Sequence, residues 1–179
     1  VYAGWEERPT GDVDVLIAPA DLDRARAALR AIGWADMGEG ADSDEAADEA
    51  FLRAEGYNWK AVEPGGVPLE LHFRLWGCAP EGLGASVLTR AVADPEAGET
   101  ARRLRLEDAW VLHAVHWWTT LPVRPLLYLW DLRRITEAAG DRFAADVTTQ
   151  VRRWGLQLFV APVAAAVGAL WDDATHRAI

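Results

Sequence analysis

The 179-residue sequence contains a single cysteine, Cys78, and no apolar run long enough to cross a membrane. One cysteine allows no disulfide within the chain and excludes the paired-cysteine motifs of zinc and thiol redox sites. A membrane helix needs about 20 predominantly apolar residues, and the start of the chain lacks the basic and then apolar layout of a signal peptide. These absences predict a cytoplasmic protein without a membrane partner.

Basic residues are also scarce, because 18 Lys+Arg stand against 28 Asp+Glu and give a formal net charge of −10. Long nucleic acids and anionic membranes are bound by clustered Lys and Arg, so this balance disfavours both as partners. Seven of the acids lie between Asp36 and Glu49 with no basic residue among them, which leaves −3 for the rest of the chain. We expect this acidic segment to be a loop or a frayed helix.

Residues 1–100 are predicted to form an α+β region. From the alternation and the helical period of apolar residues, its expected elements are a strand over 12–17, a helix over 21–32 and a hairpin over 57–73. The apolar face of the first strand comprises Val13, Val15 and Ile17. Asp21 is the expected N-cap of the helix, Ile32 closes its apolar stripe, and Gly33 ends it. A Gly/Pro-containing stretch over 77–84 and a short segment to about residue 94 follow, with no helix or strand assigned to them.

Residues 101–179 are predicted to be helical after a short strand over 102–106. The expected helices cover residues 107–119, 126–139, 143–154 and 156–171. Pro122 and Pro125 separate the first two helices, since proline lacks the N–H that a helix interior requires. The sequence begins with Val, and a strand motif follows shortly after it. We therefore expect the natural chain to extend upstream of Val1.

Two acids that are two positions apart, Asp12 and Asp14, are the most informative feature. Alternate residues of a strand point to one face, so these carboxylates are expected to lie together. On a second strand, Glu70 and His72 share the polar face and Leu69 lies on the apolar one. Adjacent carboxylates favour a bound cation such as Mg²⁺, and Glu70 would supply a third ligand. The alternative is a solvated strand edge, since acids occupy 28 of the 179 positions.

Four further residues are candidate substrate contacts, namely Arg8, His72, His113 and Asp131. Arg8 would neutralise the carboxylates or contact a phosphate, or it is an ordinary surface arginine. His72 would reach the same site, or it is a partly exposed strand histidine. If the helices on either side of residue 122 are antiparallel, His113 faces Asp131. We favour a hydrogen bond between these two helices, and the alternatives are a substrate contact or a metal shared with His116.

Several short motifs occur in an order that is similar to that of a known family. They are RPTGDVDVLI at 8–17 followed by Gly33-Trp34, LELH at 69–72, LED at 106–108 with His113 and His116, and LWDL at 129–132. Together they resemble the uncharacterised nucleotidyltransferase-like family of the polymerase-beta superfamily, from about Arg8 to Ile135. The resemblance implies a nucleotidyltransferase-like mixed sheet with flanking helices, followed by the helical C-terminal region.

The resemblance also implies a catalytic role for Asp12, Asp14 and Glu70. In such proteins these carboxylates hold two Mg²⁺ ions, which orient a nucleoside triphosphate. A hydroxyl group of a small molecule or a protein attacks the α-phosphate, and pyrophosphate leaves. Glu70 or Asp14 would assist the deprotonation of that hydroxyl.

One motif of the superfamily is not recognisable in the sequence. This is the h-G-[GS] turn, which binds the triphosphate ahead of the carboxylate strand. Gly4-Trp5 lacks the second small residue and lies too near Asp12, so the turn either lies upstream of Val1 or was lost. The sequence therefore leaves three functions open: a Mg²⁺-dependent nucleotidyltransferase, a non-catalytic binding or accessory domain with the same fold, and a structural helical interaction module.

Overall fold

The computed structural model describes residues 11–37, 50, 52–76, 79–119, 126–172, 175 and 178–179. The chain forms two compact units, the N-terminal unit (Gly4–Thr89) and the C-terminal unit (Arg90–Ile179). The first contains a mixed four-stranded sheet and the second consists mainly of helices. This architecture confirms the predicted α+β fold class. The two predicted domains, with their boundary at residue 100, stay a prediction.

The sheet of the N-terminal unit has the strand order β1-β4-β3-β2. Its strands are β1 (Val13–Leu16), β2 (Ala35–Asp36), β3 (Asn58–Val62) and β4 (Pro68–His72). The β1–β4 pair is parallel, whereas β3 pairs antiparallel with both β4 and β2. The predicted hairpin is therefore present as β3 and β4. Its turn ends at Gly66, whose φ of +90° is a conformation that glycine adopts without strain.

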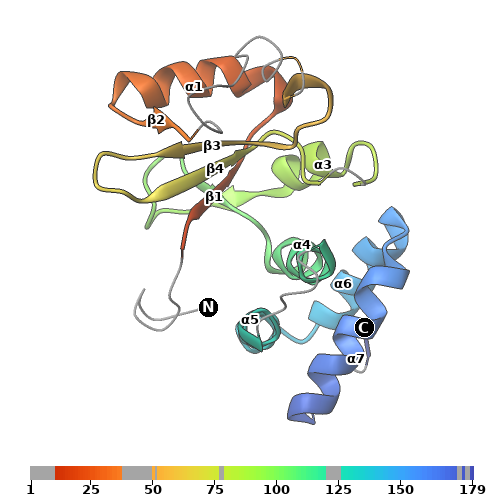
Figure 1. The fold of residues 1–179 in the computed structure, drawn as a ribbon. Coiled ribbons are helices and arrows are strands. Elements are labelled where there is room, and N and C mark those ends of the chain that lie inside the picture. The colour runs from red at the N-terminus through yellow and green to blue at the C-terminus, as the bar shows by residue number, and fades with distance from the viewer. Residues whose placement is uncertain are drawn as a thin grey trace. The chain divides into compact units, whose positions relative to one another are not determined.

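Helix α1 (Leu22–Ala31) covers one face of this sheet (Figure 1). The apolar core beneath it comprises Leu22, Trp59, Ala61, Leu69, Leu71 and Phe73, with Val15, Ile17, Ala25 and Leu29 packed against them. Because side chains alternate along a strand, the core residues of β3 and β4 leave their sequence neighbours on the opposite face. That opposite face carries the polar residues on which the functional site depends.

Three details of the predicted strand and helix are wrong. Val13 is 45% exposed, because it begins the edge strand and the core contacts start at Val15. Ile32 is 70% exposed, since it follows the last turn of α1 and its φ of −102° and ψ of 13° are not helical. Asp21 precedes α1 but makes no capping hydrogen bond, because a 3-10 turn, η2 (Pro19–Asp21), gives it helical rather than extended dihedral angles.

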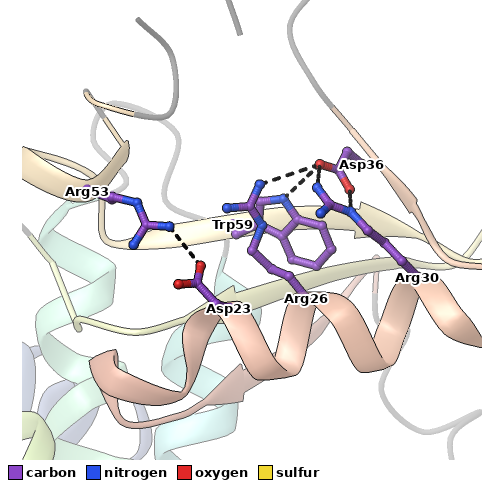
Figure 2. Close-up of polar contacts among 6 residues, drawn as sticks. All are labelled: Asp23, Arg26, Arg30, Asp36, Arg53 and Trp59. Atoms are coloured by element: carbon purple, nitrogen blue, oxygen red, sulfur yellow. Dashed lines mark hydrogen bonds and ion pairs between the residues drawn. The ribbon is translucent and has the colours of Figure 1, made fainter. Parts of the chain in front are cut away.

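Asp36, the first residue of the acidic segment, lies in strand β2 and not in a loop. Arg30 donates two hydrogen bonds to its carboxylate, at 3.0 and 2.5 Å. Arg26 lies 3.7 Å from the same carboxylate, and both guanidinium groups lie over the ring of Trp59 (Figure 2). These contacts tie the two-residue edge strand to α1. Residues 38–49, the rest of the predicted acidic loop, lie outside the described residues.

The charge of Asp36 is expected to stabilise the N-terminal unit in a pH-dependent way. The hydrogen bond from Arg30 is the main cause that holds the pKa of Asp36 below its usual 3.8. A lowered folded-state pKa adds stability above the usual value, and that stability is lost as the pH falls through the lowered pKa. Asp36→Asn should therefore reduce the free energy of unfolding by about 0.5–1 kcal/mol at neutral pH and by less in acid, measured by urea denaturation.

The matched control for Asp36→Asn is the same change in an Arg30→Gln background. The two side chains exchange two hydrogen bonds, so removing Arg30 first should remove most of the effect of Asp36→Asn. An equal loss of stability in both backgrounds, or a loss that does not depend on pH, would contradict the assignment of this stability to the ion pair.

The C-terminal unit begins with the end of α3 (Leu83–Arg90), a helix that the sequence pattern did not predict. Strands β5 (Val92–Ala93) and β6 (Arg102–Arg103) follow and pair antiparallel with each other. The remaining elements are the helices α4 (Leu106–Thr119), α5 (Leu126–Glu137), α6 (Phe143–Trp154) and α7 (Gln157–Trp171). These four confirm the predicted helices to within two residues at each end.

Helix α4 is the centre of the C-terminal unit, since it packs against α5, α6 and α7. Its buried side chains include Trp110 and Val115, both fully covered. The first turn of α4 is also fixed by polar contacts. Asp108 is only 2% exposed, and its carboxylate accepts two hydrogen bonds from Arg90. Within the described ranges, no helix combines the length and the apolar character that crossing a bilayer requires.

Candidate metal and nucleotide site

The site starts from the parallel pairing of β1 with β4, which places Asp14 directly opposite Glu70. Directly opposite residues of paired strands project to the same face of a sheet, and His72 shares that face because it is two positions from Glu70. The apolar neighbours Leu69 and Leu71 are buried under α1. The structure thus brings Asp14, Glu70 and His72 together on the face of the sheet that α1 does not cover.

Donor atoms of these three side chains lie within 4.8 Å of one another. The Nε2 atom of His72 is 2.9 Å from Oδ1 of Asp14 and 3.5 Å from Oε2 of Glu70. The side chain of Asp14 is 63% exposed, whereas those of Glu70 and His72 are 21% and 16% exposed. The group is therefore open to solvent on the side of β1 and held by the sheet on the side of β4.

Two residues of β3 that the sequence analysis missed complete this face. The ammonium group of Lys60 lies 2.6 Å from Oε1 of Glu70, and Nδ2 of Asn58 donates a hydrogen bond of 2.5 Å to Oε2. In the antiparallel register Lys60 stands opposite Glu70 and Asn58 opposite His72. A signal for Lys60 was present, because it is the only lysine in the sequence.

The carboxylate of Glu70 is paired with a charged lysine of the same sheet. The hydrogen bond to Glu70 raises the pKa of Lys60 above its usual 10.5 despite partial desolvation, and the negative charges of Glu70 and Asp12 act in the same direction. Lys60 thus carries its charge at neutral pH and is the positive counterpart of the carboxylates. A metal ion would share or replace that role, since adjacent carboxylates repel each other without a cation.

The other predicted site residues are placed less closely. Asp12 is half-buried in the bend before β1. Its negative charge helps to raise the pKa of Lys60, but Asp12 is not in the group whose donor atoms lie within 4.8 Å of one another. Arg8 lies outside the described residues. As members of the site, both stay a prediction.

His113 and Asp131 lie in the C-terminal unit, where the expected pairing of their helices is present. The Nε2 atom of His113 is 3.2 Å from Oδ2 of Asp131, which is buried and 4% exposed. Both His113 and His116 also contact the ring of Tyr128, with centroids 5.1 and 5.5 Å away. The favoured hydrogen bond between α4 and α5 is therefore confirmed, and a contact with substrate stays a prediction.

Asp131→Ala is expected to lower the free energy of unfolding by about 1–3 kcal/mol, because it leaves the His113 ring without a buried hydrogen-bond partner. Chemical denaturation of the full chain measures this value. Glu137→Ala, which removes an exposed acid of the same helix that pairs with Arg133 and Arg134, should cost less than about 1 kcal/mol. Equal effects of the two variants would contradict a stabilising role for the buried pair.

A comparison with protein families matches residues 1–172 to the model of a family described as an uncharacterised nucleotidyltransferase. The match includes both units of the structure. No curated protein matches the chain.

Proposed function

Because this chain belongs to the family of uncharacterised nucleotidyltransferases, we propose that it transfers a nucleoside monophosphate from a nucleoside triphosphate to a hydroxyl group of a small molecule or protein. The observation that carries the proposal is the convergence of Asp14 and Glu70 from two paired strands. Phosphoryl-transfer sites depend on positioning and charge stabilisation, and two fixed carboxylates are the usual means of holding the metal ions that supply both.

The side chains present fit a divalent cation by the chemistry of their donors. Carboxylate oxygens are the ligands that Mg²⁺ prefers, and Asp14 and Glu70 offer them side by side. We propose that these two residues and Asp12 hold up to two Mg²⁺ ions. When bound, the metal neutralises charge on the triphosphate and lowers the pKa of the acceptor hydroxyl.

The protein's own residues orient and assist the reaction. Asn58 and Lys60 each bind one oxygen of Glu70, so this carboxylate is held in one orientation. The exposed carboxylate of Asp14 accepts the proton of the acceptor hydroxyl. The hydroxyl oxygen then bonds to the α-phosphorus as the bond to the bridging oxygen breaks, and pyrophosphate leaves. Arg8 is proposed to contact a phosphate, and His113 and Asp131 stay candidate substrate contacts.

The alternative, a non-catalytic binding domain of the same fold, is favoured by one observation. The sequence shows no recognisable h-G-[GS] turn ahead of β1. A domain of this kind would still bind a metal–nucleotide complex through the carboxylates, but it would not release pyrophosphate.

Calorimetry of the full chain with ATP, GTP, CTP and UTP, each with Mg²⁺, tests the proposal, and a coupled assay for pyrophosphate follows with pooled hydroxyl acceptors. Metal-dependent binding of at least one nucleotide together with pyrophosphate release supports the transferase. Binding without release in any acceptor pool supports the binding domain. If none of the four nucleotides binds, both are wrong.

Lys60→Gln is expected to increase the affinity for Mg²⁺ in the absence of nucleotide. The ammonium group occupies Oε1 of Glu70 at 2.6 Å, so a metal ion must compete with it. An exposed ion pair contributes up to about 1 kcal/mol, which corresponds to a gain of about twofold to fivefold by calorimetry. Arg30→Gln removes the same charge from α1 on the other face of the sheet and should change the affinity little. Weaker Mg²⁺ binding by Lys60→Gln would show that Lys60 does not compete with the metal.

A further inference from the structure

The structure holds a nitrogen donor where a Mg²⁺ site would have oxygen. We infer that His72 is a metal ligand together with Asp14 and Glu70, and that the site takes a first-row transition-metal ion such as Mn²⁺ in preference to Mg²⁺. The inference rests on the metal site of the proposed function and names the class of ion that it binds. From the sequence, His72 was a candidate substrate contact or a partly exposed strand histidine.

The positions of the three donor atoms carry the inference. Nε2 of His72 approaches both carboxylates, at 2.9 Å from Asp14 and 3.5 Å from Glu70. Around a metal with six ligands at about 2.0–2.1 Å, neighbouring donor atoms are about 2.9 Å apart. One ion between the carboxylates would therefore be within bonding reach of the ring nitrogen with only small side-chain movements.

The ring of His72 is held in this position before any metal binds. Its side chain is 16% exposed, and it stacks on Tyr57 with ring centroids 6.0 Å apart and planes 27° from parallel. Its backbone belongs to β4, which is paired on both sides, with β1 and with β3. A fixed ring that presents Nε2 to two carboxylates loses little freedom on binding a metal ion.

The donor chemistry decides which metal is preferred. Imidazole is a poor ligand for Mg²⁺, which prefers carboxylate oxygens and water, but it binds first-row transition metals well. Where Nε2 carries the proton of its hydrogen bond to Asp14, one metal–nitrogen bond forms, one N–H bond breaks, and the proton passes to solvent. With two carboxylates and one imidazole, the site should bind Mn²⁺ more tightly than Mg²⁺. Such an ion would keep open coordination positions for the phosphate oxygens of a nucleotide.

Electron spin-echo modulation of Mn²⁺ bound to the full chain tests the ligand directly. The spectrum should show coupling to a ¹⁴N nucleus, and the coupling should change to that of ¹⁵N when the histidines are labelled with ¹⁵N. It should be lost in His72→Gln, whose amide oxygen replaces the ring nitrogen. His113→Gln is the matched control, because His113 is also bonded to an aspartate, and it should retain the coupling.

Calorimetry with each metal alone gives the selectivity. His72→Gln should weaken Mn²⁺ binding at least about tenfold, since even outer-shell partners of a metal site contribute that much, and should change Mg²⁺ binding less than about twofold. Bound Mn²⁺ without nitrogen coupling, or equal losses for the two metals, would overturn the inference. In that case, nucleotide binding would still support the proposed function. If no nucleotide binds with either metal, the proposed function is wrong, but the assignment of His72 as a metal ligand is not affected. If His72→Gln does not fold, the labelled protein together with His113→Gln, His116→Gln and His176→Gln still decides the question, because nitrogen coupling that all three variants retain leaves His72 as the remaining histidine.

Discussion

Asp14→Asn is expected to reduce metal-dependent nucleotide binding and pyrophosphate release at least about a hundredfold. The change keeps the size of the side chain but removes one of the two charges that converge from β1 and β4. A metal ion in a carboxylate site supplies several kcal/mol of charge stabilisation, and each 1.36 kcal/mol corresponds to a factor of ten in rate. Glu70→Gln should have an effect of the same order.

Asp23→Asn is the matched control for Asp14→Asn. Asp23 is an exposed carboxylate of α1 in the same unit, where it lies 2.8 Å from Arg53 (Figure 2). The Asp23→Asn variant loses one negative charge, as Asp14→Asn does, but from the helix that covers the opposite face of the sheet. Its nucleotide binding should therefore stay within about twofold of the wild type. If Asp14→Asn and Asp23→Asn reduce binding equally, or if Asp14→Asn binds nucleotide normally, the carboxylate site is wrong.

Arg90→Met is expected to lower the free energy of unfolding by about 3–5 kcal/mol. The guanidinium group of Arg90 bonds both carboxylate oxygens of Asp108, which is 2% exposed at the start of α4. Removing one partner of a buried ion pair leaves the other charge without compensation in a medium that solvates it poorly. Because α4 packs against the other three helices, we expect the loss across the C-terminal unit.

Two further variants identify the cause of that loss. Arg90→Met combined with Asp108→Leu removes both charges and should recover a large part of the stability, since an apolar pair can replace a buried ion pair. Arg133→Met breaks the more exposed pair with Glu137, in which the distance is 2.7 Å, and should cost less than about 1 kcal/mol. Urea denaturation of the full chain measures all three. A double variant as unstable as Arg90→Met would show that the loss does not come from an unpaired charge on Asp108.

The same residues show what the LED motif at the start of the helical region does in this structure. Its sequence suggested only acids in the first turn of a helix, where they complement the helix dipole. In the structure, Glu107 pairs with Arg105 near the surface, but Asp108 is buried against Arg90. The partner lies 18 positions earlier in the chain, so no local pattern indicated that this acid is structural.

The candidate site was predictable only in part. The alternation around Asp14 and around Glu70 placed each residue on the polar face of a strand. That the two strands pair, and that Asp14 stands opposite Glu70, depends on a parallel register between segments more than 50 residues apart. A shift of one position would move one of the two carboxylates to the other face. The hairpin that carries Lys60 and Asn58 was predicted, but its register, which sets Lys60 opposite Glu70, was not.

The periods of the apolar residues determined the α+β class, the four C-terminal helices and the two carboxylate strands, whereas scarce cysteine and the acidic balance only excluded classes of site and partner. All of these depend on properties of neighbouring residues, which the sequence displays directly. Only the tertiary structure decided which side chains share the site: His72 and Lys60 join Asp14 and Glu70, whereas Asp12 stays outside the closest group. Strand order and register set those distances, and they depend on how the whole sheet packs beneath α1.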